Sequence, residues 1–279
     1  MLGALLVACV GLGALIAQLA PAWPTGLHPW VTALAGAVVA AVSSVVIAER
    51  GLRPTGAVFP VFATTAVATA PSAAPTWLAM LIAGGAVAWC LAMSALAHWM
   101  GEANPGGPVP APVPGSGTRS FRLQELSRYG IAALVAGAIA TLSGIPSPYW
   151  AQVAAVVPLS APGRRQQIER GLHRIVGTAI GVGAAAFLLS FPSQAWQVIV
   201  WVVLMQFLAE LFVLRNYSLA LVFITPLALL MVFLAHPGPV GPLLVARIAE
   251  SAIGAVVGIA VVLGAVVLEP VLRRRSDQS

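Results

Sequence analysis

Apolar residues run along the chain in long, nearly uninterrupted stretches separated by short polar or arginine-bearing segments. Because these stretches do not alternate between polar and apolar positions, they predict helices and not the strands of a β-barrel. Most of them approach the roughly 20 residues that a helix needs to cross a bilayer. We therefore expect an all-α, polytopic transmembrane bundle of about ten helices, near residues 2–20, 30–48, 55–71, 76–98, 129–145, 148–162, 174–191, 195–213, 218–236 and 242–268.

Two of the expected spans are short for a full crossing. Residues 55–71 contain Pro60, and residues 148–162 contain Pro158. Proline removes a backbone N–H and clashes with the preceding turn, so it kinks or ends a helix. We expect these two segments to be tilted, kinked or partly re-entrant.

The expected helices fall into two blocks, four followed by six. Residues 101–128 separate the blocks and begin with the string GEANPGGPVPAPVPGSGTRS, which is typical of an extended or flexible linker. We therefore expect a four-helix membrane block at residues 1–100, a cytoplasmic linker at 101–128, a six-helix membrane block at 129–270 and a basic cytoplasmic tail at 271–279.

The two blocks share a short sequence similarity, which we call the echo. Residues 49–52 and 169–172 both read ERGL, and Trp30 and Trp150 precede them by the same distance. Transporters are often built from internal repeats, which is one explanation of the echo. Chance identity in a chain of biased composition is the other.

Composition supports the membrane assignment. The chain is 59% hydrophobic and only 8% charged, whereas soluble domains are about a quarter charged. A soluble core has no room for that much apolar surface, so the lipid bilayer is the expected surrounding. Residues 2–20 lack a basic leader and a good cleavage site, and we interpret them as a retained helix.

The basic residues indicate an orientation. All 14 are arginine, and with 8 acidic residues they give a net charge of +6. With the N-terminus in the cytoplasm and ten crossings, the arginines outside the spans all fall on the cytoplasmic side, as the positive-inside bias requires. We expect a multi-pass protein of the cytoplasmic membrane with both termini cytoplasmic, and this use of the charge argues against nucleic-acid binding.

The second block carries a set of motifs. Tyr149-Trp150 opens a helix, GRRQQIERGLHR follows at residues 163–174, and Arg174 to Gly181 read RIVGTAIG. Arg215-Asn216-Tyr217 and Thr225-Pro226 come next, and the last helix contains Arg247, Glu250 and Gly254. Over about residues 120–270 the chain resembles the fusaric acid resistance protein-like (FUSC) family, which includes aromatic acid exporters, and more distantly the plant aluminium-activated malate transporters.

The resemblance implies secondary export of small organic carboxylic acids, expected to be aromatic. The malate-transporter likeness implies a passive organic-anion channel instead, and a non-transporting membrane scaffold is a third reading. Members often carry a long cytoplasmic helical domain, whereas this chain ends at Ser279. We expect a homo-oligomer, a dimer above all, or a partner chain that supplies the cytoplasmic helical domain.

No enzyme, cofactor or metal site is expected. The chain has no lysine and hence no Walker A motif, so ATP-driven pumping is not expected. It has no GxSxG or HExxH motif. Cys9 and Cys90 both lie in apolar runs, and no cysteine–histidine cluster suggests a metal ligand set.

The motifs supply candidate site residues. Arg174 begins its helix, and its planar guanidinium suits a carboxylate as well as it suits positive-inside anchoring. Gly177, Gly181 and Gly254 allow another helix to come close. With Arg174, we assign the substrate path to Arg215, Arg247, Thr178 and Thr225.

Two acidic residues are candidates for proton coupling. Glu210 follows Gln206 by one turn, and it either titrates or pairs with Arg174 or Arg215. Glu250 follows Arg247 by three residues, so the two share one helix face. An unpaired charge at membrane depth is costly, and we expect Arg247 to rest against Glu250 or Glu210 until a substrate arrives.

Overall fold

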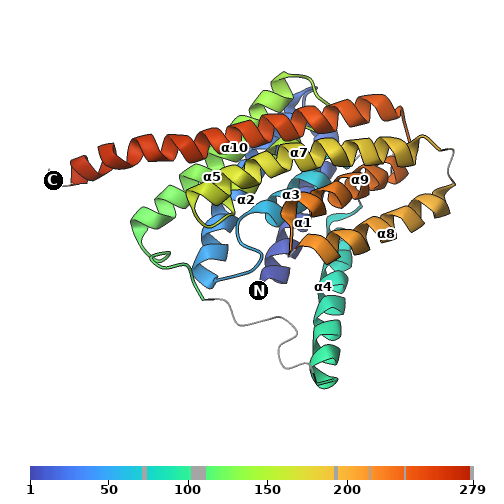
Figure 1. The fold of residues 1–279 in the computed structure, drawn as a ribbon, viewed down its shortest axis with the longest axis horizontal. Helices are drawn as coiled ribbons and strands as arrows, with labels where there is room; N and C mark the ends of the chain where they lie inside the picture. Colours follow the sequence, from blue (N-terminus) through green and yellow to red (C-terminus); the bar gives the residue numbers. More distant parts are fainter. Residues whose placement is uncertain (71–73, 102–110, 192–193, 214, 236, 277–279) are drawn as a thin grey trace. The chain divides into compact units, whose positions relative to one another are not determined.

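The computed structural model describes residues 1–70, 74–101, 111–191, 194–213, 215–235 and 237–276, with side chains described as far as residue 265. Its secondary structure consists of ten α-helices and one short 3-10 helix, with no strand among these residues (Figure 1). The expected all-α fold of about ten helices is confirmed. The chain divides into two compact units, residues 1–138 and 139–279.

Among the described residues, eight helices are long and apolar enough to cross a membrane. The other two, α3 (Val58–Ala68) and α6 (Tyr149–Leu159), have 11 residues each. At 1.5 Å per residue they reach roughly 17 Å, about half of the hydrocarbon core. The chain is therefore a multi-pass membrane protein in which two of the ten expected spans are half-length.

Unit 1 is built around α1 (Leu2–Leu19), which packs against α3 and α4 (Thr76–Trp99). The 3-10 helix η1 (Ala20–Ala22) leads from α1 to α2 (Leu27–Arg50), and α2 packs on α3. Gly13 lies where α1 meets α3, because a Cβ there would meet the Thr64 carbonyl. Small residues thus let these helices approach closely.

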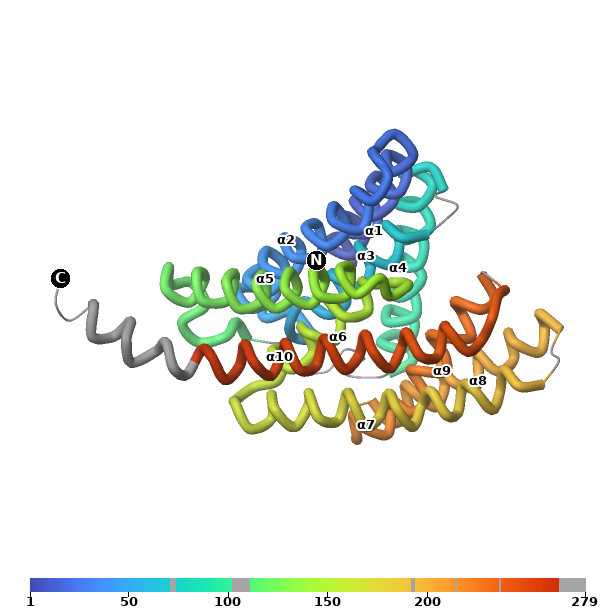
Figure 2. Tube along the Cα trace, turned by 90° about the horizontal axis from the view of Figure 1, so that it is seen from above, coloured from blue at the N-terminus to red at the C-terminus, as the bar shows by residue number. Residues whose placement is uncertain are grey.

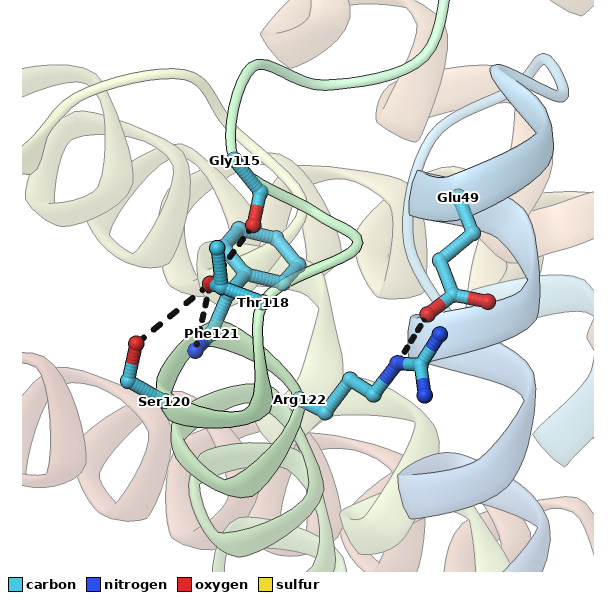
Figure 3. A network of polar contacts seen from close by, with 6 residues as sticks. All are labelled: Glu49, Gly115, Thr118, Ser120, Phe121 and Arg122. Atoms are coloured by element: carbon cyan, nitrogen blue, oxygen red, sulfur yellow. Dashed lines mark hydrogen bonds and ion pairs between the residues drawn. The ribbon is translucent and has the colours of Figure 1, made fainter.

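Helix α5 (Arg119–Leu142) begins ten residues before the span expected at 129–145. Thr118 precedes it, and its Oγ1 accepts a hydrogen bond from the Phe121 N–H at 3.3 Å (Figure 3). A threonine that accepts this bond caps a helix start. Arg122, one turn on, pairs with Glu49 at the end of α2 (Figure 3). Residues 119–128 are therefore helical, and residues 102–110 of the expected linker lie outside the described part.

Unit 2 consists of α6, α7 (Arg164–Leu189), α8 (Ala195–Val213), α9 (Tyr217–Ala235) and α10 (Val240–Ser276). Helix α10 packs along α6 and α7, α7 packs on α9, and α9 packs on α8 (Figure 2). Every residue of α6 is buried. The half-length helix is thus part of the core, which lets polar side chains near its start be sheltered from lipid.

The two ERGL strings lie in different surroundings. Trp30 and Glu49 stand at opposite ends of one continuous helix, α2, whereas Trp150 and Glu169 belong to α6 and α7. Unit 2 breaks at Ser160-Ala161-Pro162-Gly163, where the corresponding residues of unit 1 are Ala40-Ala41-Val42-Ser43. Gly163 has a φ of 85°, which glycine adopts readily. The echo therefore does not mark a structural repeat.

Candidate functional site

Three charged side chains are buried among the residues of unit 2 whose side chains the structure describes. Arg247 and Glu250 lie on α10 and are 2% and 1% exposed, and Arg174 on α7 is 4% exposed. The charges of Arg174 and Glu250 both act on Arg247, so the three are close enough to influence one another. Two arginines and one glutamate leave an excess of positive charge when all are ionised, and such a cluster is costly in a low-dielectric interior.

Close packing between α6 and α10 brings Arg247 near Trp150. A Cβ on Gly254 would meet the Ala151 carbonyl, and one on Gly258 would lie 2.5 Å from the Ala155 carbonyl. The two helices are therefore in backbone contact, which glycine alone permits. Two turns before Gly254 on α10, Arg247 lies beside Trp150.

Arg247 lies on the ring of Trp150 and forms no ion pair with Glu250. Its guanidinium carbon is 3.7 Å from the ring centroid, which is a close cation–π contact. Its Nε, Nη1 and Nη2 are buried and hydrogen-bond to no described residue, and Glu250 Oε1 is in the same state. The expectation that Arg247 rests against Glu250 or Glu210 is thus not met among the described residues, because the guanidinium lies over the indole instead.

Other buried polar atoms without a described hydrogen-bond partner lie on α7, α9 and α10. Within the described residues, no hydrogen bond is formed by Arg174 Nε and Nη2 or by the hydroxyls of Thr178, Thr225 and Ser251. Ser251 follows Arg247 by one turn on α10, and Thr178 follows Arg174 by one turn on α7. Buried polar groups are normally hydrogen-bonded. We call Arg174, Thr178, Thr225, Arg247, Glu250 and Ser251 the polar cluster.

Comparison with known proteins assigns this part of the chain. Residues 134–261 match the sequence profile of the fusaric acid resistance protein-like family. Residues 134–261, called the domain from here on, are therefore similar to the fusaric acid resistance protein-like family. The domain contains the whole polar cluster together with Trp150, and the family resemblance inferred from the motifs is confirmed.

The chain is also similar to a curated membrane protein. The chain is 30% identical over 133 residues to the uncharacterized membrane protein YvaC of Bacillus subtilis (strain 168). The match covers 47% of this chain and 21% of the relative, so the chain spans about a fifth of that protein's length. No solved structure matches the chain significantly.

The glycines of the RIVGTAIG motif pack within the domain. A Cβ on Gly177 would lie 2.7 Å from Leu221 Cβ, and one on Gly181 would lie 2.6 Å from Thr225 Cβ. Helix α7 therefore meets α9 along this face, next to Arg174 and Thr178. Both glycines already face α9 of the same chain. A contact between two copies of the chain therefore needs a different surface.

Two other candidate residues lie apart from the polar cluster. Arg215 is exposed between α8 and α9. Glu210 is exposed on α8 and accepts a hydrogen bond from Gln206 Nε2 at 2.8 Å, so these two do share a helix face. In the described part of the chain, Glu210 forms no ion pair with Arg174 or Arg215. The domain therefore joins Arg174, Arg247 and Glu250 and leaves Glu210 and Arg215 outside.

Two contacts were missed at the level of sequence. Trp150 is 8% exposed, and its ring contacts the Arg247 guanidinium. Arg170 donates to Ser160 Oγ at 2.9 Å and lies 5.5 Å from the centre of the Tyr217 ring. One sequence feature could have indicated these aromatic contacts. It is the Tyr149-Trp150 pair at the start of a short helix that is followed by an arginine-rich segment.

One surface hollow of the domain has a volume of about 520 Å³. It is lined by Phe187, Phe191, Trp196, Trp201, Gln197 and neighbouring apolar residues, and no member of the polar cluster lines it. Within the described residues, no group of three or more His, Cys, Asp or Glu side chains could hold a metal ion.

Proposed function

We propose that the fusaric acid resistance protein-like domain binds a small organic carboxylate at the polar cluster, and that the protein exports it across the cytoplasmic membrane. The observation that supports this most directly is the buried Arg247 guanidinium, whose three nitrogens hydrogen-bond to no described residue. Leaving a buried charged donor unsatisfied is costly. An anion that accepts those hydrogen bonds offsets the cost.

A carboxylate suits the groups that are present. The guanidinium offers a fork of N–H groups that matches the two oxygens of a carboxylate. Arg174, 73 positions before Arg247 in the chain but buried in the same unit, adds a second positive charge. Arg174 lies ten residues inside α7 and not at its start, and we place it on the cytoplasmic side of Arg247. The hydroxyls of Thr178, Thr225 and Ser251 supply further donors.

We further propose that export is coupled to proton entry through Glu250, with Glu210 as the alternative. A carboxyl group at membrane depth is a usual component of proton relays. Glu250 shares a helix face with Arg247, so its protonation changes the charge at the site. Glu210 is exposed beside Gln206, which fits a peripheral role less closely tied to the substrate.

Flux measurement tests the proposal. Proteoliposomes containing the full chain are expected to move benzoate uphill when a pH gradient is imposed, and the Glu250→Gln variant is expected to lose most of this dependence because its side chain does not titrate. Glu210→Gln serves as the comparison. Downhill movement alone would indicate a channel, and no flux for any aromatic or aliphatic carboxylate would overturn transport.

The orientation is a separate prediction. With all ten helices counted as crossings, the arginine distribution predicts that reporter fusions after residues 24, 115 and 239 report outside, inside and outside. Activity of paired alkaline phosphatase and green fluorescent protein fusions measures this. An outside signal at residue 115 would contradict the assignment of both termini to the cytoplasm.

A further inference from the structure

The contact between Arg247 and Trp150 leaves the guanidinium in an unusual state. A buried arginine ordinarily gives its N–H groups to carboxylates or carbonyls, which then occupy its edges. The indole instead contacts the flat face, at 3.7 Å, and accepts no hydrogen bond from it in this arrangement. The edges of the guanidinium thus hydrogen-bond to no described residue, although the group is held in place.

Glu250 is the obvious competitor for those edges. It lies three residues after Arg247 on the same face of α10, at a spacing that allows an ion pair along a helix. Glu250 is 1% exposed, and its Oε1 hydrogen-bonds to no described residue. A low-dielectric interior favours collapse of such a pair. Something must therefore hold the guanidinium away from the carboxylate.

Trp150 is itself held firmly. It lies in α6, every residue of which is buried, and its ring packs against that of Tyr149 at 5.0 Å between centroids. The next residue, Ala151, is in contact with Gly254 of α10. The indole therefore has little freedom to swing away from Arg247, because the backbone beside it is pinned to the helix that carries Arg247.

We propose that Trp150 is a positioning residue for the anion site: its ring holds the Arg247 guanidinium off Glu250 and keeps the guanidinium edges open for an incoming carboxylate. This inference rests on the proposed anion binding. With one face covered by indole, a carboxylate approaches in the plane of the guanidinium, where two parallel hydrogen bonds form. Glu250 is then the internal group that the substrate outcompetes.

The test measures benzoate binding to the full chain in lipid nanodiscs. Trp150→Leu removes the ring, so Arg247 falls onto Glu250 and affinity is expected to drop about tenfold. Trp150→Phe keeps an aromatic face and is expected to lose only about threefold. The double variant Trp150→Leu/Glu250→Gln removes the competitor as well and is expected to regain most of the affinity. Trp196→Leu, on an exposed surface of α8, is the matched control.

The outcomes separate this inference from the proposed function. A purely structural role for Trp150 predicts that Glu250→Gln gives no rescue, and that result would overturn the positioning role. Equal affinities for the wild type and Trp150→Leu would overturn it too, while leaving anion binding intact. Absence of benzoate binding by the wild type would overturn both. Melting temperatures of all variants identify any loss of affinity that comes from unfolding.

Discussion

Replacing Arg247 with glutamine is expected to weaken benzoate binding about thirtyfold, because a hydrogen-bonded charge contact contributes about 2 kcal/mol. Glutamine keeps a polar side chain of similar reach but has no positive charge and no fork of donors. Arg247→Lys is expected to restore the affinity only in part, since a point charge does not reproduce two parallel hydrogen bonds. Equilibrium binding to the full chain in nanodiscs measures all three proteins.

A matched surface variant distinguishes the loss of the buried Arg247 from the loss of one positive charge anywhere in the domain. Arg165 lies on α7 in the same domain, and its side chain is 92% exposed, so Arg165→Gln removes an equal charge without touching the interior. Its affinity is expected to stay within twofold of the wild type, about 0.4 kcal/mol. A well-folded Arg247→Gln variant with normal binding and transport would end the proposal that Arg247 contacts the anion.

The competing explanation is that Arg247 and Glu250 are only a structural charge pair. That view predicts that Arg247→Gln and Glu250→Gln each lower the amount of protein in the membrane, since each leaves one buried charge alone. It also predicts that the double variant restores abundance. Quantifying abundance and transport in the three variants decides between the two views, because a binding role predicts normal abundance with lost transport in Arg247→Gln.

The second large effect is expected at Gly254. Any Cβ at this position collides with the Ala151 carbonyl and with Ala154, and a backbone carbonyl cannot move aside as a flexible side chain does. Gly254→Val is therefore expected to lower the free energy of unfolding by about 3 kcal/mol, or roughly 8 °C in melting temperature. Thermal melting followed by size-exclusion chromatography in detergent measures the change.

Gly264 is the natural control, since it lies on the same helix and a Cβ there would meet nothing within 4 Å. Gly264→Val is expected to change stability by no more than about 0.5 kcal/mol. Equal melting temperatures for the two valine variants would contradict the close approach of α6 and α10. The Gly254→Val variant should also lose benzoate affinity, because separating these helices carries Trp150 away from Arg247.

The membrane helices could be read from the sequence because the requirement behind them is local. A lipid-exposed backbone must satisfy its own hydrogen bonds, so each apolar run becomes a helix whatever surrounds it. The start of α5 was placed too late because Arg122 and Arg128 were taken as loop residues. The cap at Thr118 was also a local signal, and together with the Arg122–Glu49 pair it extends the helix to Arg119.

The identical strings at residues 49–52 and 169–172 show that a short local identity does not determine the surrounding backbone. Four shared residues and an equal spacing to a tryptophan suggested a repeat, but the intervening residues decided the backbone. Ala40-Ala41-Val42-Ser43 continue a helix, whereas Pro162 and Gly163 end one. The shared ERGL string therefore says less about the backbone than Pro162 and Gly163, which lie between Trp150 and the second ERGL string.

The sequence by itself determined an all-α membrane protein and the family that the second block resembles, and it put Arg247 and Glu250 on one helix face. Those conclusions depend on hydropathy, helix period and motif, which are properties of contiguous residues. Only the tertiary structure decided that Arg247 lies on Trp150 and not against Glu250. The physical reason is that the partner of a buried side chain depends on how closely two helices approach, and here Gly254 and Gly258 bring α10 onto α6.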